Sequence, residues 1–139
     1  MIFQLGAILL GAIITVIVIA VIMFIIGVLV TKWWAGKKGW DDSMKLALIV
    51  NALWFVIGLV VGLGLSFIPG MGSWLGQIIS LIINIILGAF IVSKLYDKEL
   101  GESLVFVIVI QIILFIIALI LGFIIAAILA VALLGALLP

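Results

Sequence analysis

Residues 104–138 have the sequence LVFVIVIQIILFIIALILGFIIAAILAVALLGALL, 35 residues without a charged side chain. A transmembrane helix needs about 20 mostly apolar residues to cross about 30 Å of hydrocarbon. The stretch also lacks the alternation of polar and apolar residues that is typical of membrane β-strands. It therefore predicts a membrane-spanning helix.

The rest of the chain has the same character. Of its 139 residues, 71% are apolar and 8% are charged, whereas soluble domains have about 45–50% apolar and about 25% charged residues. We predict four spans, at about residues 5–31, 44–67, 74–95 and 104–139, in a single all-α membrane domain, residues 1–139. The first lysine is Lys32, after a long apolar run, which favours a retained span over a cleavable signal peptide.

The lysines predict how the chain is oriented in the membrane. All six lie in or beside the first and third loops: Lys32, Lys37, Lys38, Lys45, Lys94 and Lys98. Because lysine is enriched in cytoplasmic loops, we expect this side to be cytoplasmic and both termini to face outward. An isoleucine-rich chain with lysine and no arginine favours a prokaryotic cell membrane, archaeal or bacterial.

An internal repeat is visible in the less common residues. At a shift of 60 residues the second span matches the fourth in these pairs: Ser43 and Ser103, Asn51 and Gln111, Phe55 and Phe115, Gly58 and Ala118, Gly62 and Gly122. The first and third spans align at a similar shift, with Gly27 on Gly88. We predict two tandem helical hairpins, residues 1–67 and 68–139, related by a pseudo-two-fold axis along the membrane normal. The alternative is chance similarity between apolar helices.

Small and amide residues mark one face on each of three spans. These candidate packing residues are Asn51, Gly58 and Gly62 in the second span, Gln77, Ser80, Asn84 and Gly88 in the third, and Gln111, Ala118 and Gly122 in the fourth. Small residues let helix backbones approach closely, and amides form hydrogen bonds between helices. The alternative is that Asn51, Asn84 and Gln111 line a polar path.

The sequence offers few residues that could catalyse a reaction. Cysteine and histidine are absent, and apart from Lys45 and Lys94 at the span ends the spans hold no ionisable side chain, so we expect no catalytic residue, metal or cofactor. A net charge of +1 gives no reason to expect binding to nucleic acid. Small multidrug transporters also have four short spans, but they depend on a membrane-embedded glutamate that this chain lacks.

The first loop combines lysine with tryptophan, in Lys32, Trp33, Trp34, Lys37, Lys38 and Trp40. This combination is typical of an anchor at the membrane interface. Binding of anionic lipid headgroups is the alternative.

These features favour a non-enzymatic membrane protein that acts through helix packing. It would be a subunit, scaffold or assembly factor of a membrane complex, or a homo-oligomer, with the bilayer and other membrane proteins or itself as partners. The alternative is a channel or facilitator lined by Asn51, Asn84 and Gln111. The last span is overlong, so we expect residues 126–138 to pack on the N-terminal turns around Gly6, Ala7 and Gly11 or on a partner, with a re-entrant bend near Gly122 as the alternative.

Overall fold

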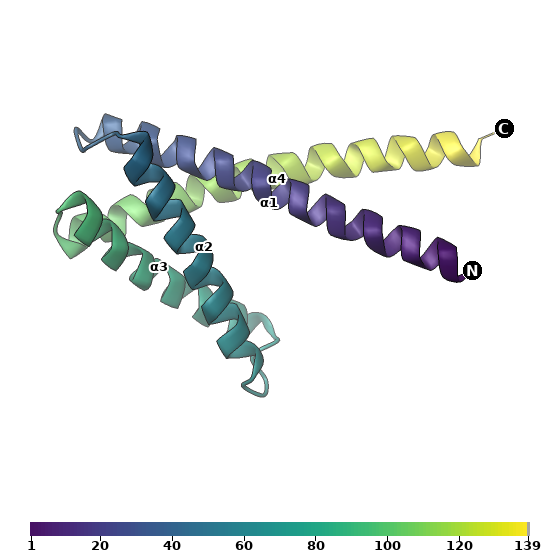
Figure 1. Cartoon of the computed structure of the whole chain (residues 1–139), viewed down its shortest axis with the longest axis horizontal. Coiled ribbons are helices and arrows are strands. Elements are labelled where there is room, and N and C mark those ends of the chain that lie inside the picture. The colour runs from purple at the N-terminus through teal and green to yellow at the C-terminus, as the bar shows by residue number, and fades with distance from the viewer. Residues whose placement is uncertain (139) are drawn as a thin grey trace.

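A computed structural model describes residues 1–138 and contains four helices in this part of the chain, α1 (Ile2–Lys37), α2 (Met44–Ser66), α3 (Trp74–Tyr96) and α4 (Leu100–Leu137) (Figure 1). Each is long and apolar enough to cross a membrane. The predicted all-α fold with four spans is confirmed. The outer helices extend further than predicted, since α1 continues through the Lys-Trp segment and α4 begins four residues earlier.

Local sequence explains how the helices are joined. The Ser43 hydroxyl accepts a hydrogen bond from the Leu46 backbone N–H at 3.3 Å, which caps the start of α2. Between α2 and α3, Gly70 has φ 83°, a left-handed conformation that glycine adopts most easily. Gly76, in the first turn of α3, lies directly against the Met71 backbone, where a β-carbon would overlap the Met71 carbonyl.

The helices form a ring in which each contacts its neighbours in sequence and α4 returns to α1. Within residues 1–138, α1 and α3 do not contact each other, and neither do α2 and α4. Figure 1 shows the α2–α3 hairpin diverging from the α1 and α4 pair, so that the α2–α3 turn lies far from both termini. The ring is therefore closed at one end and splayed at the other.

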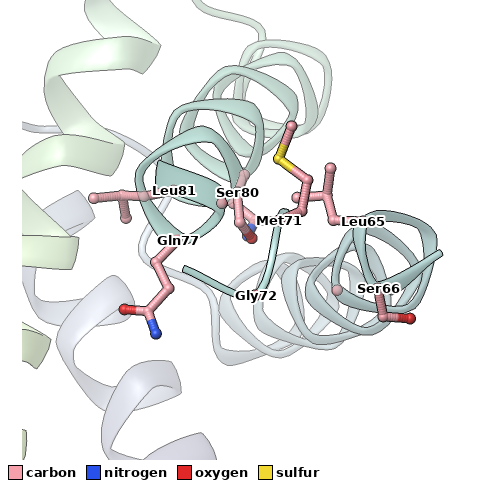
Figure 2. A pocket seen from close by; sticks show the side chains of 10 residues that line it. Leu65, Ser66, Met71, Gly72, Gln77, Ser80 and Leu81 are labelled. Carbon is pink, nitrogen blue, oxygen red and sulfur yellow. The ribbon is translucent and has the colours of Figure 1, made fainter. Parts of the chain in front are cut away.

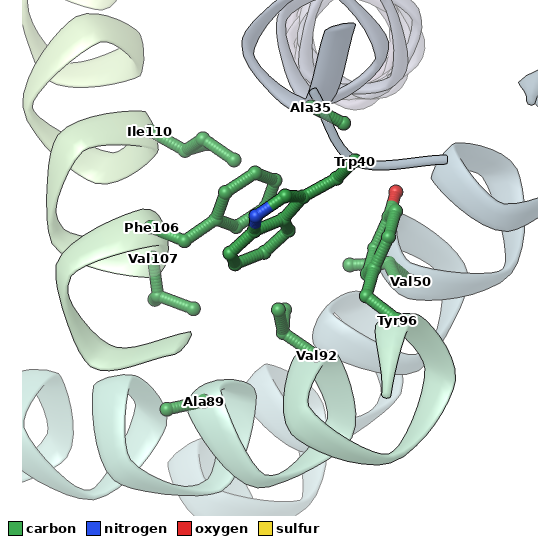
Figure 3. Close-up of a cluster of buried hydrophobic side chains, with 9 residues drawn as sticks. All are labelled: Ala35, Trp40, Val50, Ala89, Val92, Tyr96, Phe106, Val107 and Ile110. Atoms are coloured by element: carbon green, nitrogen blue, oxygen red, sulfur yellow. The ribbon is translucent and has the colours of Figure 1, made fainter. Parts of the chain in front are cut away.

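The closed end carries the lysine-bearing loops, and we call it the lysine-bearing end. Its core consists of Ala35, Trp40, Val50, Ala89, Val92, Tyr96, Phe106, Val107 and Ile110 (Figure 3). In contrast, residues 1–18 and 126–138 are exposed throughout. Packing within the chain therefore fixes only the lysine-bearing half of the ring.

The long fourth helix corrects one expectation. It is continuous through Gly122, so the re-entrant bend is wrong. Its last turns do not pack on the start of α1 either, because β-carbons placed at Gly6 and Gly11 would meet no atom within 4 Å. The two helices instead cross near their middles and diverge toward the termini (Figure 1). The other alternative, packing on a partner, stays a prediction.

The predicted duplication is not settled by the fold, but the buried positions follow its register. The buried residues of α1 are Gly27, Val28, Thr31 and Ala35, and 61 residues further on α3 buries Gly88, Ala89, Val92 and Tyr96. Ala47 and Val50 of α2 are likewise 60 residues before the buried Val107 and Ile110 of α4. The tandem repeat stays a prediction.

Candidate functional site

Asn51 joins α1 to α2. Its side-chain nitrogen donates to the Thr31 hydroxyl at 2.9 Å and to the Ala47 carbonyl at 2.8 Å, and the residue is only 7% exposed. Its side-chain oxygen faces Gly27, where a β-carbon would come within 2.6 Å of it. The Thr31 hydroxyl in turn donates to the Gly27 carbonyl at 2.7 Å. This amide therefore joins α1 to α2 with both N–H groups of its nitrogen used, and its role in packing or in a polar path stays a prediction.

Trp54 makes the corresponding connection from α2 to α3. Its indole N–H donates to the Gly88 carbonyl at 3.3 Å, and a β-carbon on Gly88 would lie 3.0 Å from the indole nitrogen. The predicted close approach at Gly88 is thus present, although its partner was not predicted. Neither Trp54 nor Thr31 stands out in sequence, because an indole or hydroxyl in a span does not indicate which helix it faces.

Asn84 and Gln111 meet at a cavity among α2, α3 and α4. The cavity has a volume of about 180 Å³ and is lined by Trp54, Gly58, Leu81, Asn84, Ile85, Val107 and Gln111. The Asn84 nitrogen donates to the Ser80 hydroxyl at 3.3 Å. The Asn84 oxygen is buried and has no hydrogen-bond partner. The cavity therefore brings two of the three candidate path residues together.

A groove beside the α2–α3 turn adjoins this cavity. It is lined by Gly62, Leu65, Ser66, Met71, Gly72, Gly76, Gln77, Ser80, Leu81 and Asn84, so Leu81 and Asn84 belong to both spaces. Figure 2 shows Ser80 on the side of α3 that faces Met71, whereas the Gln77 side chain extends away from Met71 and Leu65. The polar side chains of α3 thus lie along the groove, and Asn84 is the one that also borders the cavity.

Gln111 also faces a third hollow, toward α1. Asn51, Trp54, Gln111 and Leu114 line it with Ala20, Met23, Phe24, Phe55 and Phe115. The three amides therefore lie along successive spaces, but Asn51 is already hydrogen-bonded to Thr31. The arrangement combines a tie between helices at Asn51 with a polar cavity at Asn84.

Three predicted packing residues lie outside any contact within the chain. Gly62, Ala118 and Gly122 are exposed, and β-carbons placed at Gly62 and Gly122 would meet nothing within 4 Å. A β-carbon placed at Gly58 would also meet nothing within 4 Å, because Gly58 borders the cavity. Their packing role now requires a partner outside the chain.

The structure departs from the sequence interpretation at Trp40, which is 9% exposed and belongs to the core. Its ring stacks on Phe106 at 4.6 Å between centroids and lies 5.7 Å from Tyr96. The chain turns back at Gly39, which has φ 72°, and the Trp40 N–H donates to the Ala35 carbonyl at 2.8 Å. This turn directs the indole between the helices, where the Lys38 and Lys98 ammonium groups lie 5.2 and 5.5 Å from its ring.

The remaining residues of the Lys-Trp segment stay at the surface. Trp33 is 53% exposed, Lys37 is exposed, and Lys32, Trp34 and Lys38 are partly buried. Each indole has a lysine beside it, with Lys37 5.9 Å from the Trp33 ring and Lys38 5.9 Å from the Trp34 ring. An interfacial anchor and a headgroup site are both compatible with these positions.

No family model matches the chain, and comparison with curated proteins and solved structures finds no match to it. Among residues 1–138, no group of three or more His, Cys, Asp or Glu side chains is placed to hold a metal ion.

Proposed function

We propose that this protein is a non-enzymatic multi-pass membrane protein that acts through helix–helix contacts. Its partners would be the subunits of a membrane complex, for which it serves as subunit, scaffold or assembly factor, or further copies of itself. The observation that carries this proposal is the exposed apolar surface at the end of the ring where the helices diverge. Residues 1–18 of the chain and 126–138 near its end are apolar and exposed, and no other segment of the described chain covers them.

Lipid alone covers this surface incompletely. From Leu104 to Leu137 the apolar part of α4 has 34 residues (137 − 104 + 1), or about 51 Å at 1.5 Å per residue. Even at a tilt of 40°, the upper end of the usual range, it would span about 39 Å against about 30 Å of hydrocarbon. The end of α4 then enters the polar region, where exposed apolar surface is unfavourable unless protein covers it.

Crosslinking tests this proposal, because the chain has no native cysteine. Single cysteines placed in turn at residues 126–137 and labelled with a maleimide that carries a photoreactive benzophenone, which inserts into C–H bonds of any neighbouring protein, should form intermolecular crosslinks in native membranes. A packed helix face should give maxima every three to four positions. A matched set of single cysteines at Leu59, Val60 and Leu63 in α2, whose large side chains are exposed, provides the comparison. Equal, weak crosslinking in both scans would overturn the proposal.

A second candidate function is a facilitator for small polar solutes. It is favoured by the cavity that Asn84 and Gln111 share and by its continuity with the groove at the α2–α3 turn. Purified protein in liposomes should then increase the flux of a small solute, and Asn84→Leu should abolish that increase. An unchanged flux in the presence of the protein would exclude this candidate while leaving the crosslinking pattern unaffected.

A further inference from the structure

We propose that the cavity among α2, α3 and α4 is a hydrated site, entered from the groove at the α2–α3 turn, that takes water and small uncharged hydrogen-bonding molecules. Its polar groups are the amides of Asn84 and Gln111. The Asn84 nitrogen donates to Ser80, and the Asn84 oxygen is buried without a partner in the described chain, so it meets an occupant once the amide group turns toward the cavity. A buried carbonyl oxygen without a hydrogen bond costs about 1–3 kcal/mol. An occupant that donates a hydrogen bond removes this cost.

The cavity has the room and polarity that water requires. Its volume of about 180 Å³ accommodates several water molecules, each of which occupies about 30 Å³ in the liquid. Gln111 lines the same space, and its amide group both donates and accepts hydrogen bonds. Apolar cavities stay dry, whereas a cavity with several polar partners holds water.

The cavity adjoins the groove at the α2–α3 turn on one side and, at Trp54 and Gln111, the hollow toward α1 on the other. Leu81 and Asn84 line both the groove and the cavity, so the two spaces adjoin at these side chains. Toward the lysine-bearing end the cavity meets Val107, a core residue that is buried with Val92 and Ile110 (Figure 3). The cavity is therefore closed toward the lysine-bearing core and reached from the groove at the α2–α3 turn.

The chemistry of the lining selects uncharged occupants. The cavity is bordered by two amides, one glycine, an indole and three aliphatic side chains, without an ionisable group. A bare cation needs about six oxygen ligands, and the amides supply two. An anion would find no positive charge. Water and molecules of similar hydrogen-bonding character remain. This inference does not depend on the helix-contact proposal, and it names the solute class that the facilitator would carry.

Cysteine reactivity in liposomes tests the inference, with a membrane-impermeant charged methanethiosulfonate as probe. Ser80→Cys lines the groove and Gly58→Cys lines the cavity, where a β-carbon meets nothing within 4 Å. Ile82→Cys is the control, because Ile82 is 50% exposed on α3 but lines neither space. Since the thiolate is the reactive species, a thiol in water should react about tenfold faster or more than one in lipid. We expect this advantage for both Ser80→Cys and Gly58→Cys, from the α2–α3 turn side.

Adding Asn84→Leu separates hydration from simple exposure. Leucine has a similar size but no hydrogen-bonding group, so the cavity should become dry. The reactivity of Gly58→Cys should then fall about tenfold, while Ser80→Cys in the same background stays reactive and shows that the hairpin is folded. If Gly58→Cys reacts as slowly as Ile82→Cys, or if Asn84→Leu leaves its rate unchanged, the site is not hydrated through Asn84 and the inference is wrong. The crosslinking of α4 is unaffected by either result.

Discussion

At the scale of single residues, position in the ring decides what each glycine and amide does. Gly27 faces the Asn51 side chain closely, whereas Gly58 borders open space. The sequence predicted Asn51 and Gly88 as packing residues, and both are buried between helices. It could not predict their partners Thr31 and Trp54, because spacing along one helix carries no information about the face of the next.

The first prediction compares these two glycines. Gly27→Ala places a methyl group 2.6 Å from the Asn51 side-chain oxygen, so α1 and α2 must separate or Asn51 must move. Overpacking of this kind costs about 1–3 kcal/mol. Gly58→Ala meets nothing within 4 Å and should leave stability unchanged. Reversible unfolding in mixed micelles measures both. Equal free energies of unfolding for the two variants would contradict the α1–α2 contact.

The second prediction concerns the buried hydroxyl. Thr31→Val preserves the shape of the side chain but removes the acceptor of the Asn51 hydrogen bond. Interhelical hydrogen bonds in membranes contribute about 0.6–1.7 kcal/mol, and we expect a loss of stability in this range. Thr15→Val is the matched control, because the exposed Thr15 hydroxyl bonds only to Gly11 of its own helix. A loss of the same size in both variants would show that the contact between helices contributes nothing.

At the scale of elements, the four spans could be predicted because each is a long uncharged run bounded by charges or by Pro-Gly. The α2 and α3 boundaries differ from the prediction by one residue at most. Trp40 was interpreted wrongly for a physical reason. Lysine and tryptophan beside a span indicate the interface, but the turn at Gly39 that redirects Trp40 into the core depends on the tertiary position of α3 and α4.

The third prediction tests this aromatic core. Trp40→Ala removes a ring that stacks on Phe106 and lies beside Tyr96, and burial of this extent predicts a loss of about 3–5 kcal/mol. Trp33→Ala, at a 53% exposed ring in the same segment, should cost far less. Unfolding of the two variants in the same micelles provides the comparison. A milder effect at Trp40 than at Trp33 would restore the interfacial-anchor interpretation.

The fourth prediction tests orientation. Gly101→Cys and Gly72→Cys lie at opposite ends of the hairpins, both exposed and without an atom within 4 Å of the new β-carbon. If the lysine-bearing end is cytoplasmic, an impermeant maleimide should label Gly72→Cys from outside intact cells and Gly101→Cys only after permeabilisation. Labelling of both from the same side would refute the four-span topology, and the reversed pattern would refute the predicted orientation alone.

At the scale of the whole molecule, the helices fall into two lengths. Helices α2 and α3 have 23 residues each, about 35 Å, close to the thickness of the hydrocarbon plus its borders. Helices α1 and α4 have 36 and 38 residues and diverge from the α2–α3 hairpin (Figure 1). The excess length was visible in the sequence. The divergence of the helices could not be predicted, because it depends on which helices pack against each other, and they form a core at only one end of the ring.

The last prediction concerns this excess length. Deleting residues 131–139 leaves the core untouched, because every core residue lies at position 110 or earlier, and it leaves a fourth helix long enough to span. Insertion, the labelling of Gly72→Cys and Gly101→Cys, and stability should therefore match those of the full chain. Intermolecular crosslinking through a cysteine at residue 126 should fall, because part of the exposed apolar surface that a partner would cover is gone. If the shortened chain assembles like the full chain, the end of α4 is not an interface, and the helix-contact proposal loses the surface that carries it.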